Sequence, residues 1–159
     1  MNELTLLIDG SVNAQSKLGY GAYLVMSDPE LAPAELKARV RVRRFEQTSS
    51  TRLELQTLLW ALSEIQNSGR KLMILTDSQH IIGLPERRER LEKNDYRSRT
   101  NKRLNNYRLY QEFYRLTDQL DYELVKIRGH QPAKHKDKLD ELFTLVDRAA
   151  RKALRDAVC

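Results

Sequence analysis

Three carboxylates lie at the ends of segments whose apolar residues are regularly spaced. Two come directly after such a segment, and the third lies in the first turn of one. Asp9 follows an apolar run over residues 4–8, and Asp77 follows a second run, KLMILT. Glu54 lies between them in the chain, in the first turn of a segment with helical apolar spacing. Open α/β sheets bind ligands at the carboxyl ends of their strands, so neighbouring strands would bring these acids together.

Acids gathered in this way need compensation. Two carboxylates about 4 Å apart repel by about 4 kcal/mol at an effective dielectric near 20. Protons or divalent cations must offset that repulsion, and oxygen-only ligands select hard ions. The arrangement therefore predicts a Mg²⁺ site, with Mn²⁺ as the alternative ion.

Each acid also has an ordinary structural explanation when it is taken alone. Asp9-Gly10 is a common turn pair. Glu54 stands where a capping box that begins at Thr51 would place its glutamate. Asp77-Ser78 fits the N-cap of a following helix. Only the three acids together favour a functional site.

The elements that must position these acids alternate between strand and helix. Strand patterns occupy residues 4–8, 20–26, 39–45, 71–76 and 122–127, and the third reads as an edge strand after a loop marked by Pro29 and Pro33. Helical spacing occupies residues 50–66 and 106–120 and the end of the chain, and a short helix after Asp77-Ser78 is expected to break at Pro85. This order predicts an α/β fold whose five-stranded mixed sheet has three antiparallel strands and then parallel strands, with helices on both faces.

Length and composition narrow the class of protein. The 159 residues are expected to form a single domain, residues 1–159, and the net charge of +6 suits a polyanionic partner. The single cysteine, Cys159, cannot form an internal disulfide, which suits a reducing compartment. No stretch approaches the roughly 18 apolar residues of a membrane span, and no signal segment precedes residue 4. We therefore expect a cytoplasmic protein that does not enter a membrane.

Five stretches, in order and suitably spaced, resemble type 1 ribonuclease H: LLIDGS, TSSTRLELQTLLWAL, LMILTDSQ, VKIRGHQ and VDRAARKAL. The resemblance covers essentially the whole chain and implies a ribonuclease H-like fold. It also implies Mg²⁺-dependent cleavage of the RNA strand of an RNA–DNA hybrid by an Asp-Glu-Asp-Asp site. Asp9, Glu54 and Asp77 match the first three acids of that site, and His130 matches the histidine of the family's mobile loop.

Two aspartates compete for the fourth place. Asp140 has a common spacing from His130, whereas Asp147 better resembles the family's final helix. With Asp147 as the ligand, Val146 and Ala150 belong to an inward apolar stripe. With Asp140 as the ligand, the same stripe would bury Asp147, at a cost in free energy. We favour Asp147, although Asp140 shares its helix face and could assist.

The resemblance implies hydrolysis of a phosphodiester by two metal ions. Asp9 would bridge both ions, Glu54 and Asp77 would hold the ion near the leaving group, and Asp147 would hold the ion near the attacking water. His130 would move a proton or help to release product. A solvated loop histidine is its ordinary alternative.

A basic stretch, residues 84–105, matches the family's protrusion, which grips the duplex backbone. It has no tryptophan, and Tyr96 and Tyr107 are possible substitutes. A solvated charged face is the ordinary alternative. The residues expected to contact nucleic acid are Gln79, Ser50, Thr51, Arg97, Arg99, Lys102 and Arg103.

The expected partner is an RNA–DNA hybrid duplex, bound by the chain as a monomer. The rival hypothesis is a ribonuclease H-like module that binds nucleic acid without catalysis or with a different specificity. Clustered acids argue against it, because a surface for a polyanion gains nothing from negative charge without metal.

Overall fold

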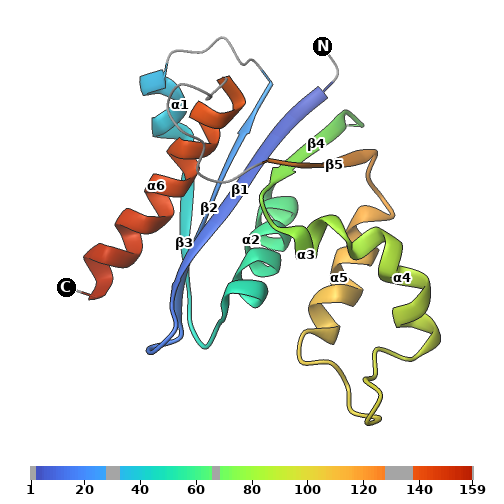
Figure 1. Cartoon of the computed structure of the whole chain (residues 1–159). Helices are drawn as coiled ribbons and strands as arrows, with labels where there is room; N and C mark the ends of the chain where they lie inside the picture. The colour runs from blue at the N-terminus through green and yellow to red at the C-terminus, as the bar shows by residue number, and fades with distance from the viewer. Residues whose placement is uncertain (1–2, 28–32, 66–68, 128–137, 159) are drawn as a thin grey trace.

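The computed structural model describes residues 3–27, 33–65, 69–127 and 138–158, and in these ranges it forms one mixed sheet with helices on both faces (Figure 1). The strands are β1 (Glu3–Asn13), β2 (Leu18–Met26), β3 (Arg41–Phe45), β4 (Lys71–Thr76) and β5 (Tyr122–Lys126). The helices are α1 (Pro33–Arg39), α2 (Ser50–Glu64), α3 (Gln79–Ile82), α4 (Leu84–Lys93), α5 (Tyr107–Thr117) and α6 (Lys138–Val158).

The sheet has the strand order β3-β2-β1-β4-β5. β2 pairs antiparallel with β1 and β3, whereas β4 pairs parallel with β1 and β5. β1 and β4 take the centre because their apolar residues are buried on both faces, as parallel strands under helices require. The predicted α/β fold, including the edge position of β3, is confirmed.

Each face of the sheet has its own hydrophobic core. On one face, Leu6 and Ile74 pack with residues of α2 and α5 such as Leu58 and Phe113. On the other face, Leu7 and Leu75 pack with residues of α1 and α6, which include Leu36 and Val146. The two helices that matter most for the site, α2 and α6, therefore lie on opposite sides of the sheet.

Two helices were missed by the sequence analysis, and proline was the cause both times. Residues around Pro33 were expected to form a loop, but α1 begins at Pro33. Pro85 was expected to end a helix, but it lies in the first turn of α4. Proline is tolerated in a first helical turn because the backbone N–H that it lacks has no helical partner there. Both expectations were wrong.

The first strand is longer than its apolar run. β1 was expected to end at Ile8, but its pairing with β2 continues through Asp9↔Ala22 to Asn13↔Leu18. Its parallel pairing with β4 ends earlier, at Leu7↔Leu75. Asp9 is therefore not in a turn: it lies on β1 just past the end of the pairing with β4.

Candidate active site

A pocket of about 370 Å³ opens beside β1 where the pairing with β4 ends. Because no strand among the described residues lies next to β1 on that side from Asp9 onward, helices on opposite faces of the sheet both reach this space. Its lining residues come from β1, α2, the end of β4 and α6: Asp9, Gly10, Ser11, Val12, Ser50, Leu53, Glu54, Asp77, Asp147 and Arg151. The structure thus brings Asp9, Glu54 and Asp77 to one place, and Asp147 with them.

Asp9 is the most perturbed acid of the pocket. Burial, a hydrogen bond with the Asp147 side chain and the charge of Asp77 raise the pKa of Asp9 to about 8, against the opposing effect of a hydrogen bond from the Gly10 backbone. A carboxyl whose pKa lies there is largely protonated at neutral pH, so in the metal-free protein a proton offsets part of the repulsion among the acids. Asp9 interacts with both neighbours and links the Asp77 and Asp147 sides of the pocket.

Glu54 is held by a hydroxyl from another element. Ser78 Oγ donates a hydrogen bond to Glu54 Oε2. Burial raises the pKa of Glu54 above its ordinary value, the Ser78 hydrogen bond opposes that shift, and the charge of Asp77 adds to it. The capping-box alternative for Glu54 is wrong: α2 is capped by Ser49, whose Oγ accepts a hydrogen bond from the Arg52 backbone N–H at 3.3 Å.

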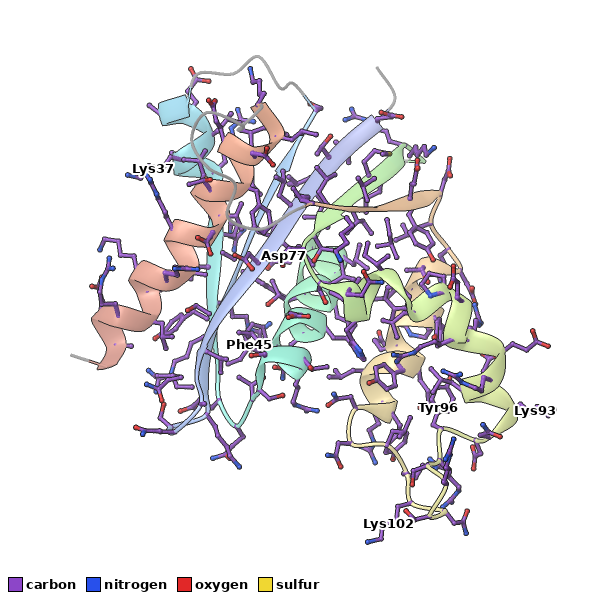
Figure 2. All side chains as sticks on the ribbon, viewed as in Figure 1. Lys37, Phe45, Asp77, Lys93, Tyr96 and Lys102 are labelled. Atoms are coloured by element: carbon purple, nitrogen blue, oxygen red, sulfur yellow. The ribbon has the colours of Figure 1, made fainter. Side chains whose placement is uncertain are left out.

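Asp77 follows the last residue of β4, and Figure 2 shows it near the centre of the molecule. The N-cap of α3 is Ser78, whose Oγ accepts a hydrogen bond from the Ile81 backbone N–H at 3.2 Å. Ser78 thus serves α3 and Glu54 together, and its neighbour Asp77 is not needed as the cap. Asp77 lines the pocket instead.

The final helix presents Asp147, and not Asp140, to the pocket. Val146 and Ala150 are fully buried beside Asp147, as the inward stripe predicts. One turn further along α6, Arg151 Nε lies 3.0 Å from Asp147 Oδ1, and Arg151 also lines the pocket. Asp140 lies two turns before Asp147, in the first turn of α6.

The donor chemistry of this pocket fits a hard divalent cation. Among the residues that the structure describes, four carboxylates and one guanidinium line the pocket, and one of the carboxyls is buried enough to keep its proton near neutral pH. Within the described ranges, no three candidate ligands stand close enough to enclose an ion in their present positions. A cation would therefore have to draw the carboxylates closer together as it displaced the Asp9 proton.

The predicted nucleic-acid contacts nearest the acids in the sequence are exposed. Ser50 and Thr51 are exposed in the first turn of α2, and Ser50 lines the pocket. Gln79 is exposed at the start of α3, where its Oε1 accepts a hydrogen bond from Lys126 Nζ at 2.7 Å. All three are accessible to a ligand that spans the pocket.

In the protrusion, helix α4 and the following turns carry the predicted cations away from the sheet, with Lys102 at the tip in Figure 2. Two of these cations already have an acidic partner, because Arg97 and Arg103 lie 3.5 Å and 3.0 Å from Asp95 Oδ2. Arg99 and Lys102 are exposed, and no described carboxylate pairs with either.

The protrusion also holds a pocket of about 760 Å³ that the sequence analysis did not foresee. Arg87, Arg90 and Arg99 line it, and none of these three has an ion pair with a described acid. His80 lines it as well, with its Nε2 3.1 Å from the Tyr110 hydroxyl. Helical spacing on α4 could have grouped Arg87 with Arg90, but α4 itself was missed.

The aromatic substitutes proposed for tryptophan differ from each other. Tyr96 is buried at 6 % exposure and belongs to the core, so it cannot stack on a nucleic acid. Tyr107 is partly buried, and the Arg103 guanidinium lies 4.8 Å from its ring centroid. The role suggested for Tyr96 is therefore wrong.

His130 falls outside the described residues, so its place relative to the acids remains a prediction. Two further residues of the pocket were not foreseen in their present roles: Ser78, which holds Glu54, and Arg151, which pairs with Asp147. The spacing of Asp147 and Arg151 by one helical turn could have indicated their pair. The contact of Ser78 with Glu54 joins separate elements and left no local signal.

A family model described as RNase H matches residues 1–154. The match includes the four carboxylates of the pocket and the whole protrusion. In the described ranges, no helix has both the length and the apolar character needed to cross a membrane.

Proposed function

The chain belongs to the ribonuclease H family, and from this premise we propose that it is an endonuclease that hydrolyses the RNA strand of RNA–DNA hybrids with the help of divalent metal ions. The match over residues 1–154 supports treating the chain as one ribonuclease H-like domain. The observation that carries the proposal is the convergence of Asp9, Glu54, Asp77 and Asp147 on one pocket.

Asp9, Glu54, Asp77 and Asp147 would hold the metal, which we take to be Mg²⁺. When bound, two such ions would supply an activated water and stabilise charge on the leaving oxygen. Asp9 is suited to the shared position because it interacts with both Asp77 and Asp147. Ser78 keeps the Glu54 carboxylate oriented, so that less freedom is lost when ligands bind.

The chain's other residues would bind and orient the hybrid. Ser50, Thr51 and Gln79 would contact it beside the acids, and Glu54 would accept a hydrogen bond from a ribose 2′-OH, the group that distinguishes RNA. Arg99 and Lys102 would contact the phosphate backbone from the protrusion, and we add Arg87 and Arg90 to that set because they line the same pocket as Arg99. His130 would move a proton or assist product release.

The direct test is cleavage of a hybrid whose RNA strand carries a label, with RNA and DNA duplexes of the same sequence as controls. We expect fragments from the hybrid with Mg²⁺ and none with EDTA or from either control duplex. Intact RNA in the hybrid at high enzyme concentration would reject the proposal. If the hybrid were still bound tightly without cleavage, the rival hypothesis of a binding module would replace it.

A further inference from the structure

A second groove, of about 700 Å³, runs between the edge strand β3 and helix α6. It lies on the flank of the molecule opposite to the protrusion (Figure 1). Its apolar surface includes Val40 and Val42 beside Ala149 and Ala153 of α6, and its basic side chains include Lys37, Arg148 and Arg155. Lys37 appears on this flank in Figure 2, far from Lys93 and Lys102.

The strand that borders the groove has a free edge. β3 pairs with β2 on one side and with no other described strand on the opposite side. Val42 is 40 % exposed, in a strand whose alternate residues should be covered on the face toward α6. An exposed edge of this kind offers unpaired backbone groups to another strand.

The charge beside this edge is strongly positive. Arg41, Arg43 and Arg44 lie on β3 itself, and Arg41 and Arg44 have ion pairs with Glu64 and Glu46. Lys37, Arg148 and Arg155 have no ion pair with any carboxylate in the described part of the chain. Among its described residues, the groove contains one acid, Asp156, which is paired with Lys152, so its cations favour an occupant with negative charge.

These features argue against two simple occupants. A second copy of this chain, paired through β3, would set arginines against arginines and pay for their repulsion. A nucleic acid could pair its phosphates with the cations, but it would gain little from contact with the apolar side chains of Val42 and Ala149. An extended polypeptide with alternating acidic and apolar side chains can use the cations, these apolar side chains and the backbone edge together.

We propose that the groove between β3 and α6 binds an extended acidic segment of a partner protein, which adds to the sheet as a strand beside β3. Backbone hydrogen bonds to the edge of β3 would supply affinity that depends little on sequence. Apolar side chains of the segment would cover Val42, and its carboxylates would approach Arg148 and Arg155. This interaction needs none of the four pocket carboxylates, so it stands apart from the proposed nuclease function.

The test uses a short fluorescent peptide in which glutamate and valine alternate, mixed with the full chain without Mg²⁺ or hybrid. We expect saturable binding by anisotropy, and slower amide hydrogen exchange over Arg41–Phe45 when the peptide is bound. Val42→Asp and the double change Arg148→Glu with Arg155→Glu should each weaken binding about tenfold. The first puts a negative charge into the apolar surface of the groove, and the second reverses the positive charge beside it. The matched control, Lys71→Glu with Arg115→Glu, changes the net charge by the same amount at sites outside the groove and should bind as the original chain does.

Two reference ligands define failure. A peptide of glutamate alone that binds as tightly, or a single-stranded DNA that binds more tightly and survives Val42→Asp, would show a general polyanion surface and overturn the proposal. Absence of peptide binding, or binding without protection of β3, would also overturn it. Hybrid cleavage by the Arg148→Glu, Arg155→Glu variant should stay unchanged, so failure here and failure of the nuclease proposal are distinguishable.

Discussion

The acidic pocket and the basic protrusion use charge in opposite ways. In the pocket, carboxylates from β1, α2, α6 and the end of β4 are partly withdrawn from water, and burial is the largest cause of the raised pKa of both Asp9 and Glu54. In the protrusion, charges are exposed and several are neutralised locally, as where Arg88 contacts Asp118 and Arg103 contacts Asp95. The first arrangement depends on the whole fold, and the second depends on α4, the turns that follow it and the end of α5.

This difference teaches where single changes should matter. Buried charges interact strongly because little water screens them, so each pocket acid is hard to replace. Exposed cations contribute weakly one at a time and can substitute for one another. We therefore expect large effects of single changes in the pocket, and small additive effects in the protrusion.

The largest effect is expected for Asp9→Asn. Loss of the carboxylate that interacts with both Asp77 and Asp147 should lower cleavage of the hybrid on the order of a thousandfold while the fold is kept. Single-turnover kinetics and circular dichroism measure the two quantities. Glu3→Gln, at the exposed start of the same strand, is the matched control and should cleave normally. Normal cleavage by Asp9→Asn would remove Asp9 from the catalytic set.

The next effect separates the two aspartates of α6. Asp147→Asn should lower cleavage about a hundredfold, because Asp147 lines the pocket and contacts Asp9, whereas Asp140→Asn should have little effect. Both variants are assayed under the same conditions with Mg²⁺ varied, since a lost ligand should also raise the Mg²⁺ concentration required. The reverse ranking would assign the fourth position to Asp140.

A third prediction concerns stability without metal. The pKa of Asp9 is raised from its ordinary value of 3.8 to about 8, so the folded state binds more protons than the unfolded state between these values. Asp9 should therefore cost stability as pH rises from about 4 to about 8, on the order of a few kcal/mol by the upper end.

Thermal melts in EDTA across this pH range measure that cost. Asp9→Asn should flatten the pH dependence and raise the Tm near pH 8, and Mg²⁺ should raise the Tm of the original chain far more than that of the variant. If the melting temperature of Asp9→Asn falls with rising pH as much as that of the original chain, then Asp9 is not the group that causes the loss of stability.

The smallest effect should come from the protrusion and should depend on which cations are removed. Replacing Arg87, Arg90 and Arg99 with glutamine should raise KM severalfold, leave kcat almost unchanged and lower the salt dependence by about 0.9 per lost phosphate contact. The matched triple replaces Arg88, Arg103 and Arg115, which are paired with acids, and should change KM less. Equal effects of the two triples would mean that net charge alone matters.

The sequence predicted the sheet better than the surroundings of the acids. Apolar runs such as KLMILT predict central strands, because a strand that is buried on both faces needs apolar residues at nearly every position. The end of β1 was misjudged because Asp9 breaks the apolar run, although pairing with β2 continues. Helices α1 and α4 were missed because Pro33 and Pro85 were interpreted as breaks in the chain's helical structure rather than as first-turn residues.

Within the site, the acids could be identified but their partners could not. Asp147 was favoured over Asp140 by the apolar stripe that contains Val146, and the pocket is lined accordingly. The hydrogen bond from Ser78 to Glu54 joins residues 24 positions apart, so only the packing of α2 beside the end of β4 reveals it. Tertiary contacts of this kind leave no periodic trace in a sequence.

Gly21 carries a consequence for how such a site can fail. A Cβ at this position of β2 would lie 2.0 Å from Thr57 Oγ1, so α2 rests against bare backbone there. The methyl group of Gly21→Ala would push α2 away from β2 and would move Glu54 away from Asp9, without altering any acid. The spacing between α2 and β2 therefore sets the position of Glu54 relative to Asp9, and a substitution at Gly21, which is not an acid, could abolish cleavage.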